Sequence, residues 1–222
     1  MRKKMRQFAI IGIGNFGYYL ATHLYEKGYE VLAIDKDANR VQEIKDGVSQ
    51  AVVADATNRK ILEPLGIKEM DAVVVCIGSV LSDSILVTLN LKDAGVKRIL
   101  AKAISDAHGR ILQKIGASEV FFPERDLAIS LAERLHNPNM LDYLPFLEGY
   151  SIIELAPSKK FTGKTLRELD LINRYGVQII AIKELIPERL NLIPTGNSIM
   201  KDSDILVLLG SNEGLEKLRE EE

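Results

Sequence analysis

Apolar and polar positions follow two alternating patterns over the first 136 residues. Short continuous apolar runs occupy residues 8–11, 31–34, 51–54, 72–77, 99–101 and 120–122. Between these runs, apolar residues recur three and four positions apart, which is typical of amphipathic helices. Continuous apolar runs suit parallel strands that are covered on both faces. The pattern therefore predicts strands joined by helical crossovers, the α/β arrangement of a Rossmann-like, doubly wound parallel sheet.

The pattern changes after residue 136. Asn137-Pro138-Asn139 ends the last helix, and residues 140–147 are apolar on too many sides for a lone surface segment. Core packing would explain this segment, and docking on another subunit explains it better, because the sheet is already complete. Beyond Gly149, strands are predicted at 150–155, 177–182, 190–193 and 205–209, with short helices at 165–169 and 213–219. We therefore expect a Rossmann domain (1–136), a crossover and interface segment (137–148) and a small α+β lobe (149–222).

Three glycines mark the turn after the first strand. Gly12, Gly14 and Gly17 have the spacing G-x-G-x-x-G, and the next helix begins at about Asn15. The first glycine permits a sharp turn, the second lets a pyrophosphate approach the backbone, and the third lets the helix lie close to the strand. The free N–H groups at the start of that helix attract phosphates. Asp35 ends the next strand, where a carboxylate accepts hydrogen bonds from a ribose diol and repels a 2′-phosphate. The motif therefore predicts an adenine nucleotide and disfavours NADP; a tight turn that binds nothing is the alternative.

The carboxyl ends of parallel strands meet at one edge of a sheet, and ligands bind outside that edge. The predicted strand ends carry Gly12, Asp35, Asp55, Gly78-Ser79, Lys102 and Glu124. Asp55 is either an acceptor for the adenine amino group or the N-cap of a helix. Lys102 either pairs with a phosphate or is a solvated lysine at a strand end.

Composition and charge exclude several classes of function. The formal charge of −2 gives no electrostatic case for nucleic acid as a partner. The apolar runs have the length of strands, not of membrane spans, and no apolar segment of a signal peptide follows the basic N-terminus. The single cysteine, Cys76, lies inside one of these runs and forms no intrachain disulfide. We therefore expect a cytoplasmic protein.

The second lobe shows no second glycine motif, no Ser/His/Asp set and no cluster of metal ligands. The three histidines, at positions 23, 108 and 136, are scattered along the chain. A nicotinamide dehydrogenase needs a substrate domain with polar groups aimed at the hydride position. The sequence therefore favours a protein that binds a nucleotide without catalysis, and a small NAD-dependent oxidoreductase is the alternative.

Taken in order, these segments resemble the RCK (regulator of K+ conductance) family. In the first domain the resemblance rests on residues 12–17 (GIGNFG), Asp35, residues 54–57 (ADAT) and residues 122–126 (FPERD). In the second lobe it rests on Leu166-x-x-Leu169, residues 174–177 (RYGV), Ile193-Pro194 and residues 204–207 (DILV). The resemblance covers nearly the whole chain and is closest to the regulatory subunits of Ktr/Trk-type potassium uptake.

The resemblance implies a cytoplasmic regulatory subunit on the inner face of the cell membrane, bound to a separate K+-translocating subunit of the Ktr/Trk type. It implies homodimers that assemble into an octameric ring, whose shape and gating respond to NAD(H), ATP or ADP. It assigns nucleotide contacts to Gly12, Gly14, Asn15, Phe16, Gly17, Asp35, Lys36, Asp55, Ala56, Gly78, Ser79, Lys102 and His108. It also implies that Glu124 holds a divalent cation (Mg²⁺ or Ca²⁺) near the phosphates at the subunit interface.

Asn15 departs from the Ktr pattern, in which an arginine often follows the second glycine. Asparagine is shorter and neutral, so it cannot neutralise an additional phosphate. The choice among ATP, ADP, AMP and NAD therefore stays open. Binding of cyclic di-AMP, a ligand of the second lobe in some relatives, stays open as well.

Overall fold

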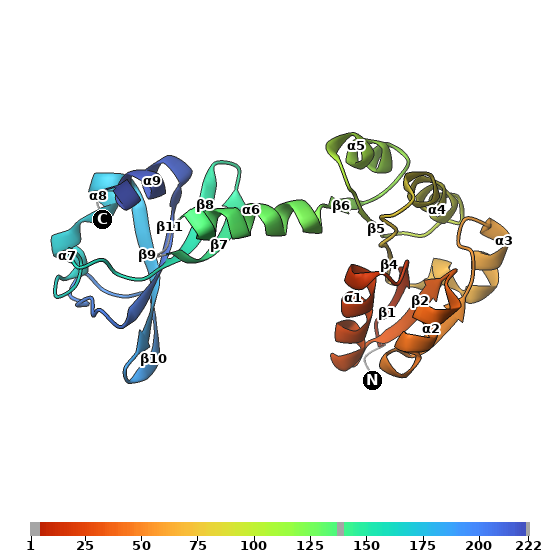
Figure 1. Ribbon diagram of the computed structural model, residues 1–222, viewed down its shortest axis with the longest axis horizontal. Coiled ribbons are helices and arrows are strands. Elements are labelled where there is room, and N and C mark those ends of the chain that lie inside the picture. Colours follow the sequence, from red (N-terminus) through yellow and green to blue (C-terminus); the bar gives the residue numbers. More distant parts are fainter. Residues whose placement is uncertain (1–4, 137–139, 221–222) are drawn as a thin grey trace. The chain divides into compact units, whose positions relative to one another are not determined.

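The computed structural model describes residues 5–136 and 140–220, which form two compact units divided between Glu124 and Arg125 (Figure 1). In chain order, the first unit contains β1 (Gln7–Ile11), α1 (Asn15–Glu26), β2 (Glu30–Asp35), α2 (Ala38–Ile44), β3 (Gln50–Val53), α3 (Arg59–Leu62), β4 (Ala72–Val75), α4 (Leu81–Asp93), β5 (Ile99–Lys102), α5 (Asp106–Lys114) and β6 (Glu119–Phe121). Short 3₁₀ helices occupy Lys45–Gly47, Glu63–Leu65 and Ile67–Glu69.

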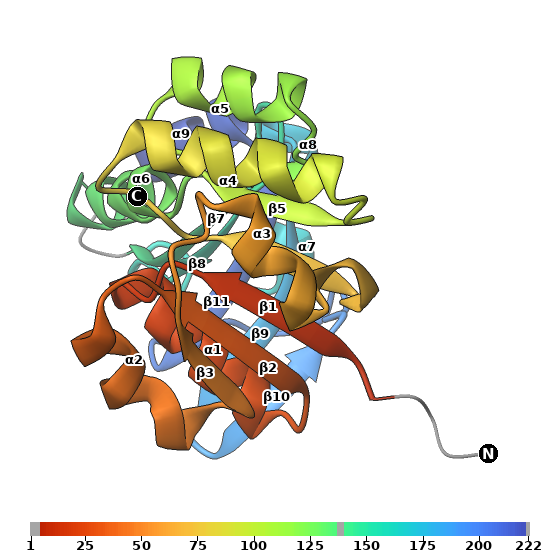
Figure 2. The same cartoon turned by 90° about the vertical axis from the view of Figure 1, so that its right-hand side faces the viewer.

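The described strands of the first unit form one parallel six-stranded sheet in the order β3-β2-β1-β4-β5-β6. Figure 2 shows β1, β2 and β3 lying side by side. The chain moves outward from β1 to β3 and then returns to the opposite side of β1 at β4. The strand order therefore reverses between β1 and β4, and such a switch point is where ligands bind at the carboxyl ends of the strands. The structure confirms the predicted doubly wound sheet.

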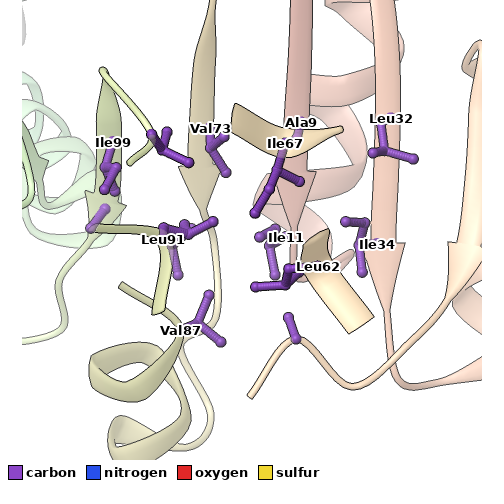
Figure 3. Close-up of a cluster of buried hydrophobic side chains, with 14 of the residues drawn as sticks. Ala9, Ile11, Leu32, Ile34, Leu62, Ile67, Val73, Val87, Leu91 and Ile99 are labelled. Carbon is purple, nitrogen blue, oxygen red and sulfur yellow. The ribbon is translucent and has the colours of Figure 1, made fainter. Parts of the chain in front are cut away.

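Helices cover both faces of this sheet, which explains why its strands are continuously apolar. On one face, Ala9 and Ile11 of β1 pack against Leu62 of α3 and Leu91 of α4 (Figure 3). On the other face, Ile10 packs in a cluster with residues of α1 and α2. Alternate residues of a strand point to opposite faces, so each of these neighbours in sequence enters a different core. A fully buried Ile or Leu contributes about 1.5–3 kcal/mol to folding.

The second unit is built on an antiparallel sheet. Helix α6 (Pro123–His136) crosses the division between the units, and it is followed by β7 (Met140–Leu147), β8 (Tyr150–Leu155), α7 (Leu166–Leu169), α8 (Leu171–Tyr175), β9 (Val177–Leu185), β10 (Glu188–Leu192), β11 (Asp204–Ser211) and α9 (Asn212–Glu220). The strand order is β10-β9-β11-β8-β7. Leu169, Tyr175 and Leu218 of the three short helices pack in one core with the inward side chains of the sheet. The predicted α+β lobe is therefore present.

Within the described residues, no helix has both the length and the apolar character that a membrane crossing requires.

The segment after α6 differs from the prediction. Residues 140–147, expected as a crossover and interface segment, form β7, which pairs with β8 at the edge of the second sheet. Tyr143 packs against the core of the second unit, while Leu144 and Phe146 are exposed. Core packing therefore explains only part of the apolar character of this segment. The two compact units divide between Glu124 and Arg125, and the domain bounds at 136 and 148 stay predictions. The predicted break at Asn137-Pro138-Asn139 lies outside the described residues.

Two short helices also differ from the pattern. Helix α8 was not predicted, because its five residues are too few to show helical spacing; it ends where Gly176 adopts a φ of 67°. Helix α3 is capped by the side chain of Asn58, which accepts from Lys60 N at 3.2 Å. Asp55, which was expected either at the adenine or as a helix N-cap, does not cap α3 and accepts from the hydroxyl of Thr57.

Candidate nucleotide-binding edge

The glycine turn after β1 is tightly enclosed at two of its three glycines. Gly12 has a φ of +95°, and a Cβ there would lie 3.0 Å from the backbone nitrogen of Ile77. A Cβ at Gly17 would overlap the carbonyl oxygen of Gly12. The space around Gly14 is different, because an added Cβ would find no atom of the protein within 4 Å. The missing side chain at Gly14 therefore leaves the backbone open to a ligand and is not needed for packing.

Helix α1 starts directly after this open backbone. Its N-cap, Gly14, has no side chain to accept a hydrogen bond, and its first turn contains no acidic residue. Asn15 is exposed at the first helical position. Phe16 is half-buried and packs on the ring of Phe121, with 5.3 Å between the centroids, so it supports the helix from beneath. The first N–H groups of α1 therefore have no capping side chain, and no acidic residue of the first turn competes with an anion for them.

Asp35 holds the glycine turn in place. Its side chain is buried at the end of β2, and Oδ2 accepts from the backbone N–H of Ile13 at 2.6 Å. The other oxygen accepts from Asp37 N at 2.9 Å, and Arg40 Nη1 lies 3.7 Å from Oδ2. Each carboxylate oxygen has a second lone pair, so a ribose hydroxyl can still donate to it. The ribose contact of Asp35 stays a prediction, and its hold on the turn is a role that the sequence reading missed.

Polar groups also pair beyond the carboxyl ends of β2 and β3. Lys36 Nζ lies 3.0 Å from Asp83 in the first turn of α4, and this hydrogen bond raises the pKa of Lys36. Asp55 accepts from the backbone N–H and the hydroxyl of Thr57, which lowers the pKa of Asp55. Asp83 was not among the predicted site residues. The rule that identified the strand ends could have found it, because the helix after β4 starts at the same edge.

Lys102 ends β5, on the other side of β1 in the strand order. A Cβ at Gly78 would lie 2.9 Å from Lys102 Nζ, so this turn and the lysine are in direct contact. The ammonium group donates to Glu124 Oε1 at 2.6 Å, and this hydrogen bond lowers the pKa of Glu124. The lysine side chain is only 11% exposed, whereas that of Glu124 is 65% exposed. Lys102 is therefore a buried cation with a carboxylate counter-ion, not the solvated lysine of the alternative reading.

Two predicted contact residues are buried. Ala56 is buried in the core beneath the sheet. The His108 side chain is buried as well, and its Nδ1 accepts from Ile104 N at 3.4 Å. Burial lowers the pKa of His108, so the ring is neutral at pH 7. Ser79, by contrast, is exposed at the edge. The nucleotide contacts of all these residues stay predictions.

A divalent cation finds few ligands in one copy of the chain. Among the described residues, no group of three or more His, Cys, Asp and Glu side chains is arranged to hold a metal ion. Glu124 offers one carboxylate, which Lys102 already engages. The described residues of a single chain therefore do not provide enough ligands for a divalent cation. The predicted role of Glu124 would require further ligands from a second subunit or from the nucleotide.

Comparison with known proteins identifies the family. The model of the TrkA-N domain matches residues 8–123, and that of the TrkA-C domain matches residues 150–221. The chain belongs to the RCK family, in its Ktr/TrkA-type branch. The resemblance inferred from the sequence is therefore confirmed.

Two curated relatives align over almost their full length. The chain is 39% identical over 206 residues to the Ktr system potassium uptake protein C of Bacillus subtilis (strain 168), covering 93% of this chain and 92% of that protein. It is 34% identical to the Ktr system potassium uptake protein A of the same organism, covering 99% and 98%. These relatives are named for potassium uptake and not for an enzymatic activity.

Solved structures share the fold at low identity. The GsuK channel has a TM-score of 0.70 at 19% identity over 98% of this chain, and the GsuK RCK domain has 0.67 at 20% identity over 99%. A GsuK channel bound to NAD has 0.65 at 19% identity over 97%. The chain spans less than half of each of these solved chains, at 39%, 48% and 39%.

The contrast between Gly17 and Gly14 can be tested by stability. Gly17→Ala forces α1 away from the Gly12 carbonyl, and we expect it to lower the free energy of unfolding by about 2–4 kcal/mol. Gly14→Ala enters open space at a φ of −77° and should cost less than about 1 kcal/mol. Urea denaturation followed by circular dichroism measures both. Equal losses for the two variants would contradict the packing described here.

His108 predicts a loss of stability on mild acidification. Its pKa is lowered in the folded state, so the unfolded chain binds more protons, and stability falls as the pH drops below the ordinary histidine value of about 6.5. The slope is at most about 1.4 kcal/mol per pH unit for one proton. Denaturation between pH 7.5 and 5.5 should show a shallower slope for His108→Asn, whose Oδ1 can accept from Ile104 N. His23→Gln, at an exposed histidine, is the control substitution.

Proposed function

We propose that this chain is the cytoplasmic regulatory subunit of a K+ transporter or channel of the Ktr/Trk type. In this proposal it binds an adenine nucleotide at the edge of the first sheet. Binding shifts the conformation of an oligomeric ring on the inner face of the cell membrane. The observation that carries the proposal is the open backbone at Gly14 in front of the uncapped α1, in a relative of Ktr potassium uptake proteins.

The polar groups of the edge suit the two ends of an adenine nucleotide. Asp35 supports the ribose, and Lys102 with the α1 N-terminus supports the phosphates, since a helix N-terminus and a cation both favour negative charge. Asp55 lies on the adenosine side, where it can accept from the adenine amino group. NAD(H), ATP, ADP and AMP share these chemical groups, and a GsuK channel of the same fold has been solved bound to NAD. The proposal therefore names adenine nucleotides as a class.

Helix α6 supports the oligomeric part of the proposal. Among its described residues none is buried, and even its leucines are exposed: Leu127 is 66%, Leu131 46% and Leu135 76% exposed. The exposed side chains of β7, including Leu144 and Phe146, add to this apolar surface. Clustered apolar side chains of this kind are typical of protein–protein interfaces. They support a homodimer as the unit of the octameric ring.

A nucleotide can regulate such a ring only through different affinities for its two shapes. No chemical step is required, so the protein acts as a sensor and not as an enzyme. The membrane subunit carries K+, and nucleotide binding to this chain changes the free-energy difference between the two shapes of the ring.

Transport assays with vesicles test this function. We expect K+ flux through the reconstituted membrane subunit with wild-type chain to change as ATP, ADP or NADH is titrated. Gly14→Val fills the open space at the phosphate approach and should weaken nucleotide binding, measured by calorimetry, by about tenfold or more, a loss of about 1.4 kcal/mol. The flux response should shift to higher nucleotide concentration by the same factor. Lys27→Val, at the other end of α1, is the control.

Two results would contradict the proposed function. One is an unchanged flux at nucleotide concentrations that saturate the chain. The other is turnover of NADH by the purified chain with an added substrate, which would favour the oxidoreductase alternative.

The oligomeric state can be tested at α6. Leu131→Asp with Leu135→Asp places charges on the apolar surface, and we expect the mass measured by light scattering to fall from an oligomer to a smaller species. Glu133→Lys, on the side of α6 where Glu133 lies 3.8 Å from Arg219, is a control for the effect of charge alone on this helix. An unchanged mass for the leucine variant would place the interface elsewhere.

A further inference from the structure

The ion pair between Lys102 and Glu124 lies beside the phosphate approach. Close packing connects them step by step: a Cβ on Gly12 would lie 3.0 Å from Ile77, and a Cβ on the next residue, Gly78, would lie 2.9 Å from Lys102 Nζ. Lys102 in turn donates to Glu124. The buried ammonium therefore sits next to the glycine turn, with its charge already satisfied by a carboxylate of the same chain.

The two partners are buried to very different degrees. Lys102 is 11% exposed, so its charge has lost most of its water and needs an anion beside it. Glu124 is 65% exposed and can return to water at little cost. A phosphate that replaces Glu124 gives the lysine a stronger anion, while the displaced carboxylate is solvated. The geometry thus favours an exchange of counter-ions over the addition of a second one.

None of the neighbouring groups considered below competes with Glu124 or a phosphate for Lys102. Asn15, at the start of α1, carries no charge. The thiol of Cys76 is buried, and burial raises its pKa to about 12, so it stays neutral and does not compete for the lysine. Asp35 and Asp83 engage Ile13 N and Lys36 on the adenosine side.

We propose that Glu124 is a built-in competitor of the nucleotide phosphates for Lys102 and thereby sets the affinity of the edge for phosphorylated adenosine. This inference rests on the proposed function and deepens it, because it names the residue that opposes binding. Glu124 is also the last residue of the first unit and lies in the first turn of α6. Each binding event therefore releases a charged contact at the junction where α6 leaves the unit.

The direction in which Glu124→Gln changes the affinity for ADP tests the proposal. Calorimetry of the full chain with ADP, in buffer that contains EDTA, compares wild type, Glu124→Gln and Lys102→Met. Removing the competitor should tighten ADP binding by about three- to tenfold, and removing the cation should weaken it. The double variant should bind like Lys102→Met alone, because Glu124 acts only through the lysine. Adenosine, which has no phosphate, should bind wild type and Glu124→Gln equally.

A second ion pair provides the matched control. Arg98 and Glu119 lie 3.5 Å apart, and the side chains of both are more than half exposed. They lie at the amino ends of the parallel strands β5 and β6, whereas the candidate site lies at the carboxyl ends. Glu119→Gln should leave ADP affinity unchanged.

The outcomes separate this inference from the proposed function. If wild type binds ADP and Glu124→Gln binds it equally or more weakly in EDTA, the competitor role is overturned and nucleotide binding stands. If wild type binds no ADP, ATP or NADH, the proposed function fails and the inference fails with it. Tightening that is equal for adenosine and ADP would also overturn the inference, because it would not involve the phosphates.

Discussion

The close approach of α1 to the glycine turn is the constraint on which the candidate site depends. Gly17 lies against the Gly12 carbonyl with no room for a side chain. This contact seats α1 on the sheet between the ends of β1 and β4, and it fixes the direction of the first helical N–H groups. Asp35 then holds Ile13 N from the end of β2. The anion-binding geometry of the edge is therefore made by packing and by backbone hydrogen bonds, before any charged side chain contributes.

The charged side chains of the edge already have hydrogen-bond partners within the protein. Asp55 engages Thr57, Lys36 engages Asp83, and Lys102 engages Glu124. A nucleotide must therefore exchange protein contacts for its own, and the net gain of each exchange is smaller than that of a new contact. In the proposed function, these exchanges make nucleotide binding reversible and dependent on ligand concentration. That behaviour suits a sensor better than a site built to retain a cofactor through many turnovers.

The sequence predicted most of the fold, because the features that determine it are local and repeated. Continuous apolar runs marked the parallel strands, and the spacing of Gly12, Gly14 and Gly17 marked the turn. The sequence did not reveal that Asp35 holds the backbone of the turn. An aspartate after a strand looks the same in a sequence whether it binds a ribose or a backbone N–H group. It also did not reveal the pair of Lys102 and Glu124, 22 residues apart, although both had been placed at strand ends. The burial of His108 depends on how α5 packs, which no local pattern shows.

The position of Glu124 links the phosphate end of the edge to α6. Among its described residues, this helix has no buried side chain. The hydrogen bond from Lys102 to its first turn is a polar contact at this junction, and it is one that a phosphate can replace. A core contact could not serve in this way, because an anionic ligand does not compete for apolar surface. In the proposed function, this charged and replaceable contact is the one through which a phosphate acts on the start of α6.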